Sequence, residues 1–466
     1  MGDPRLTSRP SGVYFTAKRG ENDGVWEIKR IKGKTIRKIA AGLFLVATAA
    51  AFSGMAGVGA EFLHVQFGPS LLSVCTAFSA GSLAALIGIA VVTFVFGRFY
   101  CAVFCPLGIV QDVAAFVFRR RKAFEKNAAL VRYVVAGVVY GMLIAGWSVG
   151  FFLLDPYSIT GRIAVSFSIG ALAPFLIVLT LGVWRRRFYC VALCPVGTLL
   201  GLIAGHGVYR LRITGKCVRC GKCVGECPSG CIDLEAGTID NERCVRCMNC
   251  VSSCPLHGIH LVRPEKKTMA FDASRRAFLR GGGALLVGLA GGFALAKAGM
   301  GKLAAFAGRF RILPPGAGNA VRFAARCTGC QLCTANCPAK IIRPAEYGAG
   351  PVSLDLSKGA CRFDCHRCSQ VCPTGAIRPL SLEEKRKTRI AEAQFLPKNC
   401  IVFQEGTPCG RCAKACPTRA VTLRRTGAPK LNASLCIGCG ACQLVCPAPE
   451  KAMVIREVEE QTLLPS

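Results

Sequence analysis

Two cysteine runs of identical spacing lie between residues 217 and 255, and they constrain this chain more than any other feature. Each reads Cys-x2-Cys-x2-Cys-x3-Cys-Pro. The eight thiols are Cys217, Cys220, Cys223, Cys227, Cys244, Cys247, Cys250 and Cys254. Zinc sites usually present two separated cysteine pairs, whereas three closely spaced thiolates followed by Cys-Pro hold a [4Fe-4S] cubane. The runs therefore predict iron–sulfur clusters.

In such a double run, three thiolates of one run hold a cluster and the fourth reaches the neighbouring cluster. We therefore predict an α+β fold of the bacterial two-cluster ferredoxin type at residues 211–265. The first cluster is assigned to Cys217, Cys220, Cys223 and Cys254. The second cluster is assigned to Cys244, Cys247, Cys250 and Cys227. Cys231 and Cys75 are expected to be spare thiols.

Four more runs predict a four-cluster module at residues 326–460. The outer two runs have regular spacing: Cys327, Cys330, Cys333, Cys337, and Cys436, Cys439, Cys442, Cys446. The middle two are irregular: Cys361, Cys365, Cys368, Cys372, and Cys400, Cys409, Cys412, Cys416. We pair the two outer runs with each other and the two inner runs with each other. Cys446 then completes the cluster of the first run, and Cys337 completes that of the last run. Cys416 likewise completes the cluster of the second run, and Cys372 completes that of the third. Pairing of runs adjacent in sequence is the alternative.

The composition indicates a membrane protein that carries these modules. Of 466 residues, 30 are cysteine and 52% are hydrophobic. The net charge of +33 counts cysteine as neutral, and six tetrathiolate clusters would remove roughly a dozen positive charges. Many of the remaining basic residues flank apolar segments, where membrane topology explains them better than nucleic acid does.

Four apolar segments at 39–60, 79–97, 131–153 and 167–184 have lengths close to that of a membrane-spanning helix. They follow a basic tail at 1–38, and Lys and Arg gather in the second connection and after the fourth segment. Basic connections stay in the cytoplasm. We therefore predict a four-helix membrane domain at 39–210 in the bacterial inner membrane, with the N-terminus and the first ferredoxin in the cytoplasm.

This domain contains an internal repeat, Arg-Phe-Tyr-Cys-x3-Cys-Pro-x-Gly, which begins at Arg98 and again at Arg187. Its four cysteines are Cys101, Cys105, Cys190 and Cys194. Cysteines four residues apart would share one helix face, and the proline suits a break where the chain leaves the membrane. Together the thiols could bind a metal, or they could remain free, and the spacing does not decide between these alternatives.

The stretch 272–308 begins Asp-Ala-Ser-Arg-Arg-Ala-Phe-Leu and continues as a Gly/Ala/Leu-rich run. The pair Arg275 and Arg276 in this context resembles a twin-arginine export signal, here acting as a fifth, signal-like helix. Ala294-Leu-Ala296 could serve as its cleavage site. After a linker at 309–325, the last module would then lie in the periplasm. The alternative is an apolar linker, with all clusters in the cytoplasm.

The segments, paired Cys-x3-Cys-Pro motifs and first ferredoxin resemble the NapH-type (NosR/NapH-like) membrane ferredoxins. The last module resembles the NapG/MauM-type twin-arginine polyferredoxins, so the chain looks like a fusion of the two. This resemblance implies a relay that passes electrons between the membrane quinone or quinol and a periplasmic reductase or cytochrome, as the ferredoxin-type subunit of a quinol dehydrogenase. An accessory or maturation factor for a periplasmic metalloenzyme is the alternative.

We expect six [4Fe-4S] clusters and no haem, flavin or nucleotide. The chain has five histidines, none within an apolar segment, and shows no nucleotide-binding fingerprint. No catalytic residues or substrate-converting site are predicted. Glu61, His64 and Asp112 could relay quinone protons, although such residues are more often ordinary surface polar groups.

Overall fold

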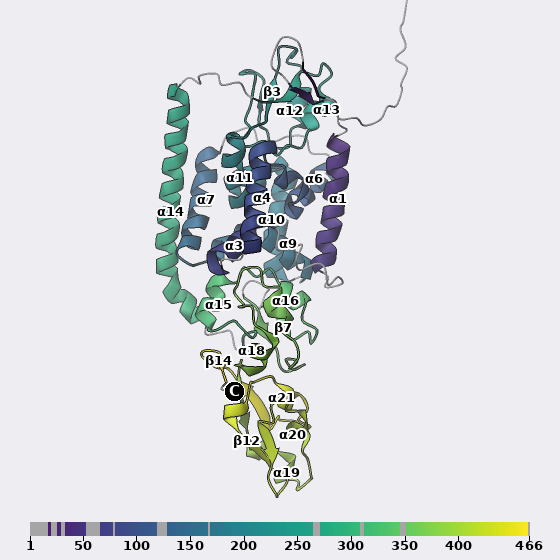
Figure 1. Ribbon diagram of the computed structural model, residues 1–466, viewed down its shortest axis with the longest axis vertical. Coiled ribbons are helices and arrows are strands. Elements are labelled where there is room, and N and C mark those ends of the chain that lie inside the picture. The colour runs from purple at the N-terminus through teal and green to yellow at the C-terminus, as the bar shows by residue number, and fades with distance from the viewer. Residues whose placement is uncertain are drawn as a thin grey trace, which may run out of the picture.

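The computed structural model describes residues 17–19, 26–28, 33–52, 66–77, 80–118, 128–165, 168–263, 271–307, 312–344 and 351–464. The molecule is elongated, and its helices form a layer between two cysteine-rich modules (Figure 1). The module with β3, α12 and α13 caps one end of this layer, and the module from α15 to β14 extends from the other end. Glu61 and His64 lie outside the described residues.

The helical layer contains long helices and several short ones. The longer helices are α1 (Gly33–Phe52), α4 (Ala80–Phe96), α7 (Ala129–Ile144), α10 (Ile169–Arg185) and α14 (Phe271–Ala307). The shorter ones are α3 (Phe67–Ala77), α5 (Tyr100–Val103), α6 (Pro106–Val117), α8 (Val149–Leu154), α9 (Pro156–Val165), the π-helix η1 (Tyr189–Leu193) and α11 (Pro195–Gly205). By length and composition, α1 and α14 could each cross a membrane, whereas α4, α7 and α10 are apolar but slightly shorter.

Two expectations about these helices are wrong. The segment 131–153 is not one helix, because Gly146 adopts a φ of 85° between α7 and α8, a backbone conformation that suits glycine. The prolines of the repeat do not mark where the chain leaves the helical layer. Pro106 and Pro195 instead begin the apolar helices α6 and α11. Proline suits a first helical turn because its missing N–H would have no helical partner there.

Helix α14 packs backbone to backbone against α7 through two pairs of glycines spaced four residues apart. A side chain at Gly137 would place its Cβ 2.5 Å from the carbonyl oxygen of Leu285, and one at Gly288 would place it 2.6 Å from that of Val134. Gly141 and Gly292 complete the pairs. Small residues at this spacing let apolar helices approach closely. The helix that follows the predicted export motif is therefore a packed part of the layer.

We expect Gly288→Leu to destabilise the chain by about 1–3 kcal/mol, because the added side chain overpacks the contact between α7 and α14. Thermal unfolding of the purified protein measures this loss. The matched control is Gly291→Leu in the same helix, since no atom lies within 4 Å of a Cβ at Gly291. Equal melting temperatures for the two variants would contradict the close helix contact.

The first cysteine-rich module is small and symmetric. Strands β3 (Arg210–Ile213) and β6 (Ile259–Val262) pair antiparallel, with Arg210 opposite Val262. Between them lie α12 (Lys222–Glu226), the hairpin of β4 (Ile232–Asp233) and β5 (Thr238–Ile239), and α13 (Asn249–Ser253). Near the N-terminus, β1 (Ala17–Arg19) pairs antiparallel with β2 (Trp26–Ile28).

The second cysteine-rich module combines short helices and antiparallel strand pairs around its own apolar core, formed by residues such as Phe323, Ile341 and Met453. Its helices are α15 (Ala320–Arg326), α16 (Leu332–Ala335), α17 (Arg367–Gln370), α18 (Leu382–Lys387), η3 (Pro397–Asn399), α19 (Ile401–Gln404), α20 (Arg411–Ala415), η4 (Ala433–Leu435) and α21 (Ala441–Leu444). Its antiparallel pairs are β7 (Ile342–Arg343) with β8 (Ser353–Leu354), β9 (Thr388–Arg389) with β14 (Thr462–Leu463), β10 (Glu392–Phe395) with β13 (Met453–Arg456), and β11 (Val421–Leu423) with β12 (Pro429–Leu431).

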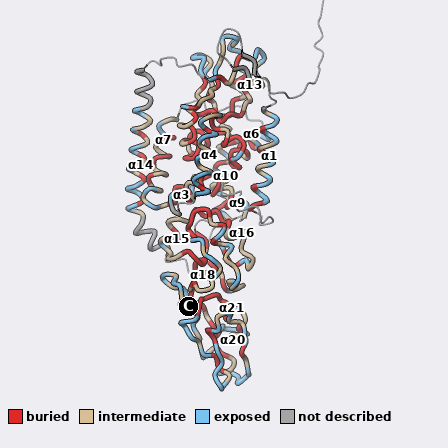
Figure 2. The backbone as a smooth tube through the Cα atoms, in the orientation of Figure 1, coloured by how far each residue is buried: buried red, intermediate tan, exposed pale blue. Residues whose placement is uncertain are grey.

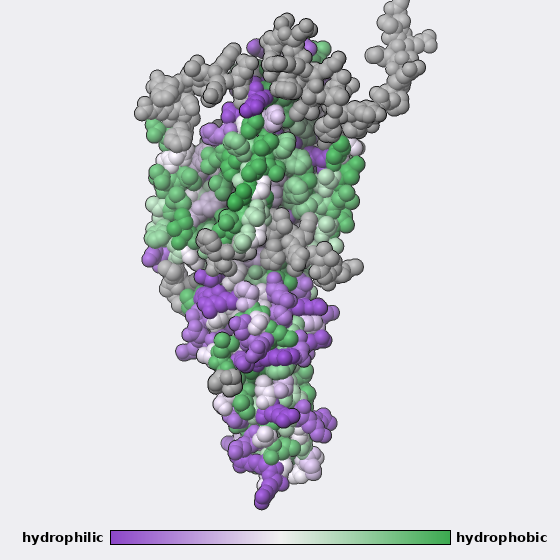
Figure 3. Space-filling view, viewed as in Figure 1, coloured by the Kyte–Doolittle hydropathy of each residue, from purple (hydrophilic) through white to green (hydrophobic). Residues whose placement is uncertain are grey.

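Buried residues run through the centre of the molecule and continue into both modules (Figure 2). The visible surface of the helical layer is mostly apolar, whereas hydrophilic residues are frequent on the second module (Figure 3). The helices expose large apolar side chains that include Leu43, Ile87, Leu176 and Leu286. An apolar surface of this extent marks a contact with a membrane or another protein.

Candidate metal centres

In the first module the thiols gather in two groups. Cys217, Cys220, Cys223 and Cys254 line one hollow together with apolar residues such as Ile213 and Ile259. Cys227, Cys244, Cys247 and Cys250 line the other, with Leu211 and Val245. These are the groups that the spacing predicts, and they arise because α12 packs on α13, which brings the two runs side by side. That these thiols ligate clusters stays a prediction.

In the second module the outer-with-outer pairing is wrong. The structure brings together Cys327, Cys330, Cys333 and Cys372, and separately Cys416, Cys436, Cys439 and Cys442. Cys400, Cys409 and Cys412 meet Cys446, and Cys361, Cys365 and Cys368 meet Cys337. Runs adjacent in sequence pair because α16 packs on α17 and α20 on α21. The module is thus built from two consecutive two-run units.

The backbone of each regular run bends in the same way. The residues directly before the second cysteine and directly after it have positive φ in all four runs: Arg219 and Gly221, Arg246 and Met248, Gly329 and Gln331, and Gly438 and Gly440. Left-handed residues on either side of a cysteine form a turn of the kind that can direct backbone N–H groups towards an anion. The sequence reading missed this turn, although glycine at four of the eight positions was a usable signal.

Hydrogen bonds from backbone amides also reach the fourth cysteine of some runs. The N–H of Gly258 donates to Cys254 Sγ at 3.2 Å, and that of Ile377 donates to Cys372 Sγ at 3.4 Å. Such bonds favour the negatively charged thiolate, and they tune the potential of a bound cluster.

The donor set fits a multi-iron cluster. None of the thirty cysteines forms a disulfide. Burial raises the pKa of Cys442 to about 12 and that of Cys439 to about 11, so metal binding must displace their protons at neutral pH. Across the described ranges, no three His, Cys, Asp or Glu side chains are placed to hold a single metal ion. Thiols arranged around apolar hollows suit a larger core, whose chemistry is one-electron transfer.

Cys231 is closer to a predicted cluster site than expected for a spare thiol. Its Sγ lies 3.5 Å from that of Cys227, within the hollow that Cys244 also lines. The hydrogen bond with Cys231 lowers the pKa of Cys227 to about 6, against the opposing effect of burial. Cys75 is exposed in α3.

The repeat brings Cys101, Cys105, Cys190 and Cys194 into one buried core of the helical layer. These cysteines do not share one helix face as expected. Cys101 lies in α5 and Cys190 in η1, whereas Cys105 and Cys194 are the N-caps of the helices that follow, α6 and α11. The quartet is thus formed from two equivalent turns.

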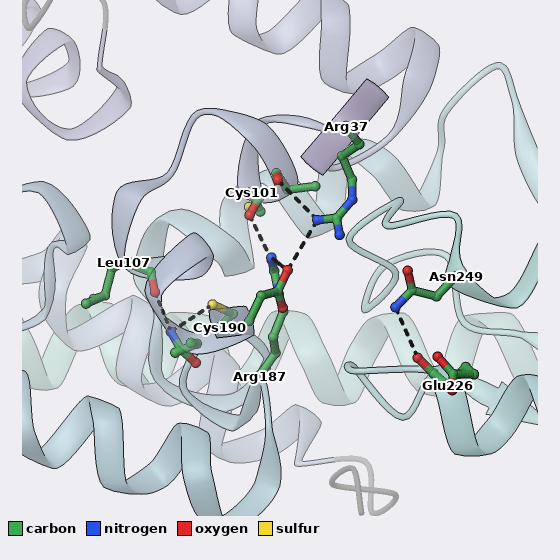
Figure 4. Close-up of polar contacts among 10 residues, drawn as sticks. Arg37, Cys101, Leu107, Arg187, Cys190, Glu226 and Asn249 are labelled. Carbon is green, nitrogen blue, oxygen red and sulfur yellow. Dashed lines mark hydrogen bonds and ion pairs between the residues drawn. The ribbon is translucent and has the colours of Figure 1, made fainter. Parts of the chain in front are cut away.

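The arginine that opens each repeat crosses over to the other repeat. Arg187 Nη1 donates to the carbonyl oxygen of Cys101 at 2.8 Å (Figure 4), and Arg98 Nη2 donates to that of Cys190 at 3.0 Å. A Cβ at Gly108 would lie 2.8 Å from the Cys101 oxygen, and one at Gly197 2.6 Å from the Cys190 oxygen. The repeated Arg therefore joins the two halves, and the repeated Gly leaves room for it, since a Cβ at Gly197 would also lie 2.6 Å from Arg98 Nη2. The sequence reading missed both roles, although both residues recur in the motif.

Asp112 is part of this junction, so its interpretation as an ordinary surface group is wrong. Its carboxylate accepts two hydrogen bonds from Arg187, at 2.8 and 2.7 Å, and one from Arg37 at 3.2 Å. The two arginines fasten α1 and the second repeat to α6.

Arg275 and Arg276 lie near the start of α14, but their side chains are outside the described residues. Their role as an export signal stays a prediction.

Four family models match the cysteine-rich parts of the chain. A 4Fe-4S binding domain matches residues 78–125 and 166–214, so that each match contains one repeat. A 4Fe-4S dicluster domain matches residues 326–376, 360–420 and 407–450. Further 4Fe-4S binding domains match residues 238–260 and 214–230. These matches confirm that the protein binds several [4Fe-4S] clusters. It is an iron–sulfur electron-transfer protein.

Among curated proteins, the ferredoxin-type protein NapF of Escherichia coli is 32% identical over 126 residues, which cover 26% of this chain and 71% of NapF. On this coverage the chain belongs to the family of ferredoxin-type proteins that includes NapF. The ferredoxin-type protein NapH of Escherichia coli is 30% identical over 34% of this chain and 58% of NapH. The methylamine utilization ferredoxin-type protein MauN of Methylobacillus flagellatus is 30% identical over 35% of this chain and 63% of MauN. No solved structure matches.

The grouping in the second module can be tested by counting iron. Cys327→Ser and Cys372→Ser should each remove the same cluster, about four Fe per chain, and the double variant should lose no more than either single variant. Combining Cys372→Ser with Cys400→Ser should instead remove about eight Fe, because these cysteines lie in different groups. Iron and protein assays on anaerobically purified protein measure both. The reverse pattern would support the outer-with-outer pairing.

Proposed function

We propose that the chain is a membrane-bound electron relay. Through about six [4Fe-4S] clusters it passes electrons between the quinone pool or the cytoplasmic face and a periplasmic reductase or cytochrome. The single observation that carries this proposal is the placement of cysteine groups at both ends of an apolar helical layer (Figure 1). Each cluster would be held by one of the six cysteine groups described above.

The surface of the helical layer supports a position within a lipid bilayer. Large apolar side chains are exposed on α1, α4, α7, α10 and α14, where water would make their exposure costly. The 20 residues of α1 span about 30 Å, the thickness of the hydrocarbon core of a membrane. Helix α4, with 17 residues, spans about 25 Å, which a locally thinned bilayer accommodates.

The charges support an orientation with the first module in the cytoplasm. Lys34, Arg37 and Lys38 lie in the first turns of α1, and a run of three arginines, 185–187, closes α10. Both ends face the first module, since Lys34 forms an ion pair with Glu226 and Arg186 donates to the carbonyl oxygen of Gly225. Basic residues next to membrane helices remain on the cytoplasmic side. The second module would then lie in the periplasm.

Both modules are docked firmly on the helical layer, as a relay requires. Glu242 of the first module accepts hydrogen bonds from Arg132 at 2.7 Å and from Tyr133 at 2.9 Å through its carboxylate. At the other end, Cys330 packs in one apolar cluster with Phe52 and Tyr157 of the helical layer. Fixed contacts keep the distances between redox centres constant, while burial and hydrogen bonds to sulfur set the cluster potentials.

We extend the proposal to the origin of the chain. The helical layer with the first module would act as a NapH-type protein, and the second module would act as a NapG/MauM-type polyferredoxin, fused in one chain. Together they would form the ferredoxin-type subunit of a quinol dehydrogenase, with substrate chemistry left to the partner reductase.

A quinol reduction assay tests the relay. In isolated anaerobic membranes, duroquinol should bleach the visible absorption of the clusters rapidly. Glu242→Gln should slow this reduction, because the variant weakens the docking of the first module, whereas Glu235→Gln should not, since Glu235 is an exposed acid of the same module. Slow reduction of intact clusters in the unaltered chain would contradict the relay and favour an accessory or maturation role.

The orientation can be tested by exchanging Arg275 and Arg276 for lysine. If a twin-arginine pathway exports the second module, a reporter fused after Ser466 should be active outside the cytoplasm, and the double exchange should abolish that activity. Arg280→Lys in the same helix is the control and should leave the reporter exported. Reporter activity in the cytoplasm of the unaltered chain would refute the orientation.

A further inference from the structure

The quartet Cys101, Cys105, Cys190 and Cys194 belongs to none of the six cysteine groups in the modules. All four side chains are buried, and they share a core with Leu107, Leu200 and Tyr189. Four buried thiols contributed equally by two halves of a repeat are more than packing requires. The charges around them indicate what they hold.

Two arginines are buried beside the quartet. Arg98 is 0% exposed and Arg187 is 1% exposed. Arg187 is neutralised by Asp112, at 2.7 Å. Arg98 instead donates to the carbonyl oxygens of Glu242, at 3.1 Å, and of Cys190, and no carboxylate pairs with it in the part of the chain that the structure describes.

A buried cation without a counter-charge is costly. The nearest groups that can supply the negative charge are the cysteines, since Arg98 Nη2 lies 3.9 Å from Cys101 Sγ. Four neutral thiols would leave the charge of Arg98 unbalanced. Thiolates bound to a metal centre would balance it, because a tetrathiolate iron–sulfur or zinc site carries about two negative charges.

Hydrogen bonds at the quartet also fit thiolates. Gln111 Nε2 lies 3.4 Å from Cys190 Sγ, and the backbone N–H of Gly197 donates to Cys194 Sγ at 3.3 Å. Donors directed at sulfur favour its charged form. The pattern is the one seen at Cys254 and Cys372 in the modules.

The donor chemistry narrows the choice of metal. Four thiolates select zinc or iron–sulfur. The quartet, like the six groups in the modules, falls outside the geometry for one metal ion within the described residues. The 4Fe-4S binding domain model matches both halves of the repeat. A core of several irons therefore suits the site better than a single zinc ion.

We propose that Cys101, Cys105, Cys190 and Cys194 hold a seventh iron–sulfur centre, of two or four irons, inside the helical layer, with Arg98 as its counter-charge. Cys247 of the first module shares the apolar core of the quartet. One electron would leave the cluster beside Cys247, oxidising it, and reduce the buried centre, without bond or proton transfer. This electron-carrying role rests on the proposed relay, whereas the existence of the centre does not.

Metal content provides the direct test. Relative to the unaltered chain, the double variant Cys101→Ser with Cys190→Ser should lose about two to four Fe and should keep the paramagnetic signals of the module clusters. Cys75→Ser, which changes a cysteine outside all the groups, is the control and should lose none. Unchanged iron in the double variant, or one zinc per chain in the unaltered protein, would overturn the proposal.

If the double variant does not accumulate, the iron content of the unaltered protein still tests whether the seventh centre exists. Six clusters account for about 24 Fe, and a seventh centre raises the count to about 26 or 28. Mössbauer spectra of the whole protein would then contain an extra component. A count of about 24 with no extra component would contradict the centre.

Arg98→Leu tests the counter-charge. Removing a buried positive charge should lower the reduction potential of the centre, while Arg98→Lys should preserve most of it. Redox titration followed by paramagnetic resonance measures both variants against the module clusters as internal references. A potential that is equal in the two variants and the unaltered chain would refute this role of Arg98.

Failure of duroquinol to reduce the unaltered chain would count against the relay alone, because iron content reports the centre independently.

Discussion

The structure depends on one geometric constraint, which is the need to hold four thiols around each of several hollows. No cysteine group in the modules is formed by one run alone, because the fourth cysteine always comes from another run. Each module can therefore close a group only when two runs are folded against each other. The short hairpins and helices between the runs serve this purpose, and the apolar core forms largely from the residues that line the hollows.

The same constraint recurs in the helical layer in a different form. There the two halves of the repeat are held together by crossed arginines, each of which bonds to the cysteine carbonyl of the other half. Such an exchange makes the two halves interdependent, since the cysteine carbonyl of each turn accepts a hydrogen bond from the other half. It also places two cations in a buried position, which is costly without a counter-charge. Asp112 offsets the charge of Arg187, and we propose that a centre held by the quartet offsets that of Arg98.

Direct contacts join both modules to the helical layer between them. The first module is docked through Glu242 and shares an apolar core with the quartet, and the second is docked through Cys330 against Phe52 and Tyr157. The glycine contacts of α7 with α14 hold the helix that leads from the first module to the second. Rigid docking at both ends suits a protein that conducts electrons, because a loose connection would let the distances between centres vary.

The sequence by itself determined the chemistry of this protein. The spacing of the cysteines predicted clusters. Glycines and prolines fall where turns and helix starts occur. All of these features depend on residues that are close along the chain. Tertiary structure decided which runs pair. The outer-with-outer reading failed because regularity of spacing carries no information about which helices pack together. The roles of Arg98, Asp112 and Gly288 also depended on tertiary structure, since each acts on a residue far away in the sequence whose position only the folded helices define.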